Sequence, residues 1–181
     1  EQPADREDRS LLASLELSLE LLLERCREWL PKLGVFQGGC LEGMVCLITG
    51  FEEADWQELR SSMLIAGLME TELLSETKKP FLRFHPTLAP ALWQRLDKEE
   101  QAKLLEGYWQ AYCQLSRELY HLDDKNPHAA RALVQCELPN LLRAVRIALQ
   151  KDSTEEGVYF AEYVNRFLNN FCLRRDAEEL T

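Results

Sequence analysis

The chain has 181 residues and a formal net charge of −10, with 46% hydrophobic and 29% charged residues. This composition is ordinary for a globular protein with one larger domain or two small ones. An acidic surface repels nucleic-acid phosphates, and no apolar stretch reaches the roughly 18 to 20 residues of a membrane span. We therefore expect neither nucleic-acid nor membrane binding. Abundant Leu with only 8 Gly and 7 Pro favours a mainly helical fold.

Residues 1–9 carry no apolar periodicity, and we expect them to form a disordered tail. From Ser10 to Leu33 the Leu residues recur at spacings of three and four, which predicts one helix or two in close succession. The alternation from Leu15 to Leu21 also fits a strand. We favour helix because the run is long and lacks β-branched residues.

A turn and two helices are predicted between residues 38 and 67. Gly38 and Gly39 mark a turn, and residues 41–49 form a short apolar helix that Gly50 closes. Asp55, with Glu58 three residues later, predicts a capping box at the start of the next helix. That helix directs Leu59, Met63 and Ala66 toward a core and ends at Gly67.

Two short apolar runs, residues 68–74 and 81–84, enclose a polar turn and predict a β-hairpin. Pro86 then opens a helix that runs to Leu96, with Pro90 as an interruption or kink. Residues 10–97 thus follow the order helix, helix, helix, hairpin, helix, which is the order of a winged-helix domain.

Residues 98–181 show only long amphipathic helices. The pattern predicts a loop at 123–127, a helical region at 128–150 that Pro139 splits, and a third helix. Such helices favour antiparallel hairpins of a tetratricopeptide-like, superhelical repeat. The inward residues expected for the three helices are Leu105, Tyr108, Trp109, Tyr112, Leu115 and Leu119, then Leu133, Leu141, Val145 and Leu149, then Phe160, Val164, Phe167, Leu168 and Phe171.

Six cysteines occur without any C-x-x-C pair, and four of them lie in apolar helical stretches. This pattern indicates free thiols that act as small core residues in a cytoplasmic protein. Both ends of the chain are polar, the first residue is not Met, and residues 174–181 are still helix-like. We expect a fragment of a longer protein.

Several short motifs occur along the chain in an order that resembles a known protein family. Residues 14–92 resemble the winged-helix domain of STAND-class signal-transduction ATPases, such as NB-ARC proteins, in their bacterial form. The resemblance rests on Leu15-Glu16-Leu17-Ser18, on Leu33-Gly34-Val35-Phe36-Gln37-Gly38-Gly39, and on Phe84-His85-Pro86, which falls where the family has Met-His-Asp. The run from Glu137 to Val145, Glu-Leu-Pro-Asn-Leu-Leu-Arg-Ala-Val, resembles the start of the helical-repeat region that follows in the family.

The resemblance implies a role for His85. In the family this His contacts the phosphates of ADP in the neighbouring ATPase domain and keeps the protein closed. Pro86 stands where the family has an Asp that could orient the His. The alternative is that His85 merely begins a helix with a partly buried ring.

The fragment is expected to be non-catalytic and to hold no cofactor or metal, since it lacks the G-x-x-x-x-G-K-[ST] phosphate loop and any metal-ligand motif. ADP or ATP is expected in the neighbouring domain. The helical repeats are expected to bind a protein partner, and an exposed face at residue 181 to drive self-association.

Alternatives of other classes stay open. A DNA-binding winged helix would need basic residues on its third helix, yet residues 52–66 carry four acidic residues and one Arg. A helical adaptor without any nucleotide link is a further possibility. Three smaller sites are also conceivable: a cation site at His121, Asp123, Asp124 and His128; an acidic-partner site at Arg143, Arg146, Arg174 and Arg175; and a peptide groove at Tyr108, Trp109 and Tyr112.

Overall fold

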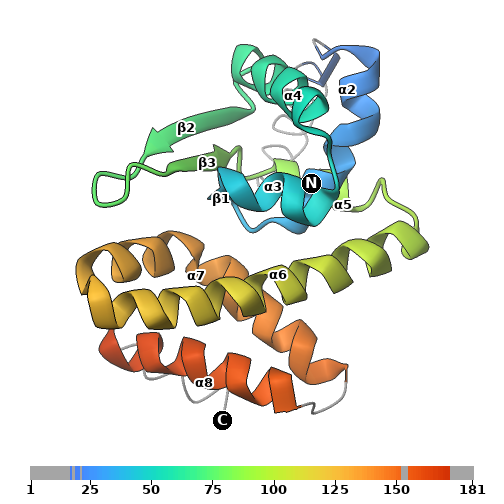
Figure 1. Ribbon diagram of the computed structural model, residues 1–181. Coiled ribbons are helices and arrows are strands. Elements are labelled where there is room, and N and C mark those ends of the chain that lie inside the picture. Colours follow the sequence, from blue (N-terminus) through green and yellow to red (C-terminus); the bar gives the residue numbers. More distant parts are fainter. Residues whose placement is uncertain (1–16, 18, 21, 152–154, 172–181) are drawn as a thin grey trace, which may run out of the picture.

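The computed structural model describes residues 17, 19–20, 22–151 and 155–171 (Figure 1). The fold is mainly helical with a small three-stranded antiparallel sheet, as expected for its coarse class. The sheet and the helices before residue 97 form one half, and three long helices form the other. The elements are α2 (Glu24–Trp29), a 3-10 helix (Leu30–Val35), β1 (Gly39–Leu41), α3 (Glu42–Thr49), α4 (Glu53–Ile65), β2 (Met69–Leu73), β3 (Pro80–Phe84), α5 (Leu88–Trp93), α6 (Lys98–Lys125), α7 (Pro127–Gln150) and α8 (Glu155–Asn170).

The N-terminal segment is mostly helical in its described residues, with a break at Leu22 and Leu23. Residues 17, 19 and 20 are helical, so helix rather than strand is confirmed at these positions, and α2 follows. Pro31 lies in the first turn of the 3-10 helix, where its missing N–H costs no hydrogen bond. The expected tail, residues 1–9, lies outside the described part of the chain.

The sequence did not predict strand β1. Its three residues pair antiparallel with β3, which puts Cys40 opposite Leu82. Gly38 precedes it with a φ of 75°, and a Cβ on Gly39 would lie 2.2 Å from the Leu82 carbonyl oxygen. Glycine is therefore required at both positions, one for its backbone angle and one for close strand contact.

Helices α3 and α4 lie close to their predicted positions. The side-chain cap predicted for α4 is absent. Helix α3 ends at Gly50, whose φ of 71° is left-handed. In α4 the N-cap is Glu52 and no side chain caps it, so the capping box at Asp55 is wrong. Helix α4 begins two residues before Asp55. Leu59 and Met63 are buried as predicted.

The predicted hairpin is confirmed as β2 and β3, and β3 is the central strand of the order β1-β3-β2. Helix α5 is shorter than predicted, since it begins at Leu88 rather than Pro86 and ends at Trp93. Pro90 therefore lies in the first turn of α5 and does not interrupt a helix.

Two predicted breaks in the helical half are wrong. Helix α6 continues through the expected 123–127 loop to Lys125, so that only Asn126 separates it from α7. Helix α7 continues through Pro139 without a split. Pro139 has no N–H for the bond to residue 135, yet the residues on both sides of it are held by other contacts described below.

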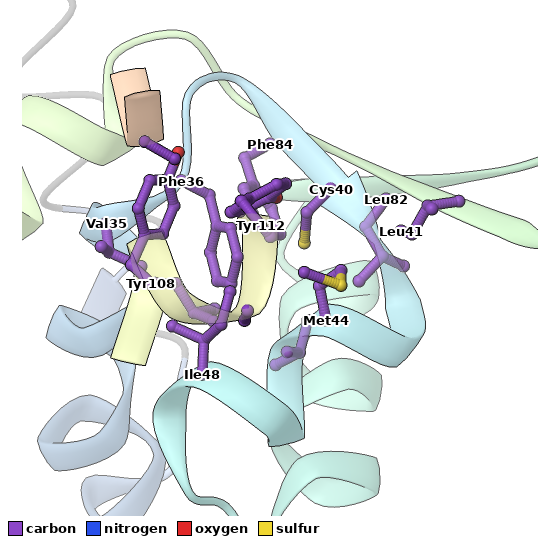
Figure 2. Close-up of a cluster of buried hydrophobic side chains, with 14 of the residues drawn as sticks. Val35, Phe36, Cys40, Leu41, Met44, Ile48, Leu82, Phe84, Tyr108 and Tyr112 are labelled. Atoms are coloured by element: carbon purple, nitrogen blue, oxygen red, sulfur yellow. The ribbon is translucent and has the colours of Figure 1, made fainter. Parts of the chain in front are cut away.

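The hydrophobic core runs without a break from Leu19 to Leu168 across residue 97. Figure 2 shows Tyr108 and Tyr112 of α6 among side chains from β1, β3 and α3. The ring centroid of Phe36 lies 6.2 Å from that of Tyr108 and 6.1 Å from that of Phe84. The aromatic stripe therefore packs in the core at Tyr108 and Tyr112, and these two residues do not line a peptide groove.

The thiols are free at the five described cysteines, and Cys26, Cys40 and Cys113 are buried, which confirms their prediction as small core residues. Burial, aided by the charges of Glu137 and Glu42, raises the pKa of the Cys40 thiol well above its usual value. Cys40 is therefore a protonated, unreactive packing residue at neutral pH.

Candidate functional site

His85 lies directly after β3, on an exposed part of the surface. Its backbone N–H donates to the Leu68 carbonyl oxygen at 3.0 Å, which continues the pairing of the hairpin by one residue. Its ring nitrogen Nδ1 lies 2.9 Å from the Thr87 hydroxyl oxygen. The exposed side chain means that the partly buried ring considered from sequence is wrong.

Thr87 is the side-chain hydrogen-bond partner of the His85 ring. A hydroxyl that donates to Nδ1 fixes the imidazole tautomer in which Nε2 carries the proton. In that tautomer Nε2 is a hydrogen-bond donor, whereas in the other tautomer Nδ1 carries the proton and donates to the Thr87 hydroxyl oxygen. The Thr87 hydroxyl can thus orient His85 although no carboxylate stands at residue 86.

His85 is one of the residues that line a surface pocket of about 390 Å³. Gly38, Gly67 and residues of the β2–β3 hairpin line it, and these include Glu70 and Arg83, which are opposite one another in the strand pairing. The Arg83 guanidinium pairs with the Glu72 carboxylate at 2.7 Å and is half exposed. This pocket therefore brings together a His, an Arg and a Glu, next to a glycine with no side chain.

A second pocket, of about 500 Å³, adjoins the first and shares Gly38 and Pro86 with it. It lies between α5 and α7, where Trp93 and Arg143 line it. The Arg143 Nη1 donates to the Val35 carbonyl oxygen at 2.5 Å. Burial lowers the pKa of Arg143, which still stays protonated at neutral pH.

Behind these pockets, a buried polar bridge joins α7 to the β1 segment. The carboxylate of Glu137, fully buried, accepts from the Leu41 N–H at 2.5 Å and from the Tyr112 hydroxyl at 2.9 Å. Asn140, also fully buried, donates to Glu137 and to the Gly39 carbonyl oxygen, both at 2.8 Å.

The amide oxygen of Asn140 completes this bridge. It accepts from the Gln37 N–H at 2.7 Å and from the Tyr108 hydroxyl at 2.9 Å. Residues 37–41 are thereby fixed to α7, and the same residues include Gly38 of the two pockets. The bridge therefore connects the position of α7 to the shape of the surface around His85.

Burial sets the protonation of the bridge. It raises the pKa of Glu137, against three hydrogen bonds that favour the carboxylate. Burial also raises the pKa of Tyr108 and of Tyr112 well above their usual value. Both tyrosines therefore keep their hydroxyl protons for donation.

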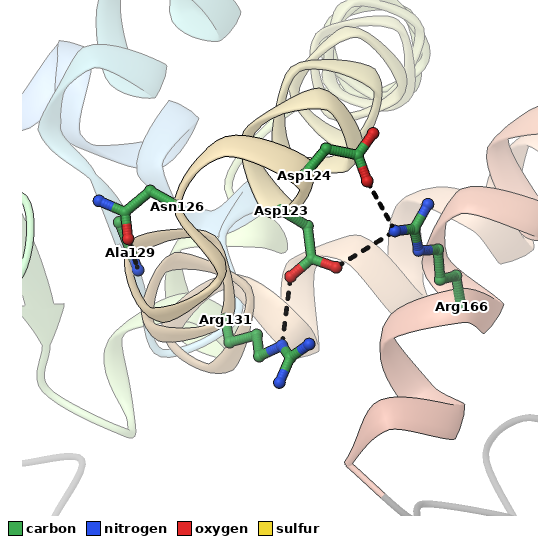
Figure 3. Close-up of polar contacts among 6 residues, drawn as sticks. All are labelled: Asp123, Asp124, Asn126, Ala129, Arg131 and Arg166. Atoms are coloured by element: carbon green, nitrogen blue, oxygen red, sulfur yellow. Dashed lines mark hydrogen bonds and ion pairs between the residues drawn. The ribbon is translucent and has the colours of Figure 1, made fainter.

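A second polar cluster lies at the far end of α6 (Figure 3). Asp123 pairs with Arg131 of α7 at 3.2 Å and with Arg166 of α8 at 3.5 Å. Asp124 contacts Arg166 at 3.0 Å, and the Asn126 side chain caps α7 by accepting from the Ala129 N–H. Asp123 thus forms ion pairs with two arginines inside the fold. It is neither a free ligand for a metal cation nor part of a solvated turn.

Helix α4 is acidic and is therefore poorly suited to bind DNA phosphates. Its single cation, Arg60, has its Nε 2.8 Å from a Glu42 carboxylate oxygen. Phosphate binding needs free positive charge, so the DNA-binding alternative is left with Lys78 and Lys79, between β2 and β3, as its basic residues.

Among the described residues, no group of three or more His, Cys, Asp or Glu side chains is placed to hold a metal ion. Across the same residues, none of the helices combines the length and the apolar character needed to cross a membrane.

No family model, curated protein or solved structure matches this chain. The relationship to STAND-class ATPases stays a prediction.

Sequence reasoning missed the roles of Glu137 and Asn140. A signal was present, because Leu133, Glu137 and Leu141 share one helix face at spacings of four, and the two leucines were predicted to be buried. A polar residue on a core face needs a buried partner. The partner could not be named, because it is backbone about a hundred residues away.

Proposed function

We propose that this chain is a non-catalytic regulatory segment of a nucleotide-switched signalling ATPase. In this proposal residues 10–97 form a winged-helix unit and residues 98–181 begin a tetratricopeptide-like repeat region. ADP or ATP would be bound by a neighbouring domain, and the repeats would bind a protein partner. The order of α2, α3, α4, the β2–β3 hairpin and α5 supports this assignment, since it follows the winged-helix order.

The observation that carries the proposal is the exposed His85, oriented by Thr87, beside an open pocket. A His donor can satisfy a phosphate oxygen of a nucleotide that another domain presents. Loss of that contact would release the domain interface, which is a known form of switching. The polar bridge behind the pocket gives a physical route by which the position of α7 would affect this contact.

The experiment is substitution of His85 by Ala in the full-length parent protein, followed by measurement of ADP retention and dissociation. We expect ADP binding to weaken about tenfold or more, the usual worth of a hydrogen bond to a charged group. His121→Ala is the matched control, because His121 is also exposed but lies far along α6. Thr87→Ala should weaken binding less, and Thr87→Ser should restore it.

Unchanged ADP dissociation in His85→Ala would contradict the nucleotide role. A fragment that binds its partner equally well with ADP, ATP or no nucleotide in the neighbouring domain would support the adaptor alternative instead. Binding to duplex DNA at low salt would support the DNA-binding alternative.

A further inference from the structure

The pocket between α5 and α7 has one charged lining residue among those the structure describes, and that residue is Arg143. The rest of the lining is apolar or uncharged, with Trp93 as a flat wall and Pro86, Pro90 and Pro139 around it. With a volume of about 500 Å³, the pocket has room for one amino-acid side chain with part of its backbone.

Arg143 is held rigidly for a surface arginine. Its guanidinium carbon lies 5.4 Å from the ring centroid of Trp93 and 5.6 Å from that of Tyr108. Its Nη1 is bound to the Val35 carbonyl oxygen. A guanidinium has five N–H donors, so that donors remain available after this bond. Arginine held in this way loses little further entropy when it binds an anion.

Arg143 also differs in its partners from several other arginines of the chain. No carboxylate pairs with it within the described part of the chain, and the only charge effect on its pKa comes from Tyr108. Arginines that pair with a carboxylate within the described residues include Arg25, Arg60, Arg83, Arg131 and Arg166. Among the described residues that line this pocket no other side chain is charged, so the Arg143 guanidinium is available to a carboxylate from outside the chain.

We propose that the pocket around Arg143 binds a carboxylate side chain from an acidic segment of a protein partner. A carboxylate matches the planar fork of one guanidinium and carries one negative charge. A phosphate has a larger charge and three acceptor oxygens, for which this pocket provides a single cation. Trp93 and the prolines would contact the apolar stem of a Glu side chain. This proposal goes beyond the nucleotide contact of His85 and does not depend on it.

The test is titration of the 181-residue chain with two capped tripeptides, acetyl-Gly-Glu-Gly-amide and acetyl-Gly-Gln-Gly-amide. The indole N–H signal of Trp93 and the Nε–H signal of Arg143 are followed by NMR. We expect saturable shifts with the Glu peptide at a dissociation constant on the order of 1 mM, and at least about tenfold weaker binding of the Gln peptide.

The variants locate the site. Arg143→Gln should abolish the Trp93 shift, and Arg143→Lys, which keeps the charge and can still reach Val35, should weaken it about tenfold because the fork is lost. Arg146→Gln, which removes one positive charge one turn away on α7, should leave the shift unchanged.

Equal binding of the two peptides would overturn the proposal. So would a Glu-peptide shift that survives in a folded Arg143→Gln or Arg143→Lys protein at full strength. Inorganic phosphate that saturates the Trp93 shift at a lower concentration than the Glu peptide would overturn the carboxylate preference.

Discussion

Two polar clusters, one at the middle of α6 and α7 and one where α6 ends and α7 begins, each bury a carboxylate but neutralise it differently. Glu137 is bound by a backbone N–H, a tyrosine hydroxyl and an amide, without a cation. Asp123 is bound by two arginines, one from α7 and one from α8. The first cluster joins segments 96 residues apart in the chain, whereas the second joins neighbouring helices.

The comparison indicates different functions for the two clusters. The hydrogen-bond donors around Glu137 belong to the backbone and to buried side chains, which cannot move freely. The bonds therefore form in only one position of residues 37–41 relative to α7. The arginines around Asp123 are long and partly exposed, so they tolerate small movements of α8. A change in α7 should therefore reach the His85 surface more readily than a change in α8.

The largest expected effect comes from Asn140→Ala. It leaves the Gln37 N–H, the Gly39 carbonyl and the Tyr108 hydroxyl without their partner in a buried site. We expect the free energy of unfolding in urea to fall by about 3 kcal/mol. Gln135→Ala, an exposed change on the same helix, is the control and should be close to neutral. A cost for Asn140→Ala no greater than that of the control would show that the bridge does not hold the two halves together.

A smaller effect, which depends on pH, is expected at Glu137. Burial raises the pKa of this carboxyl above its ordinary 4.5, so that the folded state binds the proton more tightly than the unfolded state. The stability that Glu137 contributes is therefore greatest below pH 4.5 and falls as pH rises toward the raised pKa.

Glu137→Gln removes this titration. The difference in unfolding free energy, wild type minus Glu137→Gln, should decrease from pH 4.5 upward in a series of urea unfolding curves. At neutral pH the variant should still be less stable by about 2 kcal/mol, because its amide nitrogen would face the donor of Asn140. A difference that stays constant with pH would mean that the carboxyl has the same pKa in both states.

The smallest effects are expected in the Asp123 cluster. Asp123→Asn should lower the free energy of unfolding by about 1 kcal/mol, since the amide can keep one hydrogen bond and the arginines remain hydrated. Asp124→Asn should cost about 0.5 kcal/mol or less, because Asp124 is exposed. High salt should reduce the second effect more than the first. If Asp123→Asn lowers the free energy of unfolding more than Asn140→Ala does, the Asp123 cluster is the more rigid of the two and the comparison above is wrong.

Sequence patterns predicted much of the fold because they report local structure. The three long helices and the β2–β3 hairpin follow from apolar spacing, and Phe160, Val164 and Phe167 are buried as expected. The capping box failed because α4 begins at Glu53, two residues before Asp55, so Asp55 lies inside the first turn and not at the N-cap. For the candidate site, His85 was located from a motif, but its orienting partner Thr87 was not.

The amino-acid sequence by itself determined the helical character of most segments, the β2–β3 hairpin and the apolar faces of the long helices, since these depend on neighbours close in the chain. Only the tertiary structure decided that β1 exists, because three residues form a strand only where β3 provides hydrogen bonds. It also decided that α7 continues through Pro139: Glu137 and Asn140, on either side, are both bound to residues 37–41, which compensates for the missing backbone bond. Contacts between residues a hundred positions apart leave no periodic signal, and these contacts connect α7 to the surface around His85.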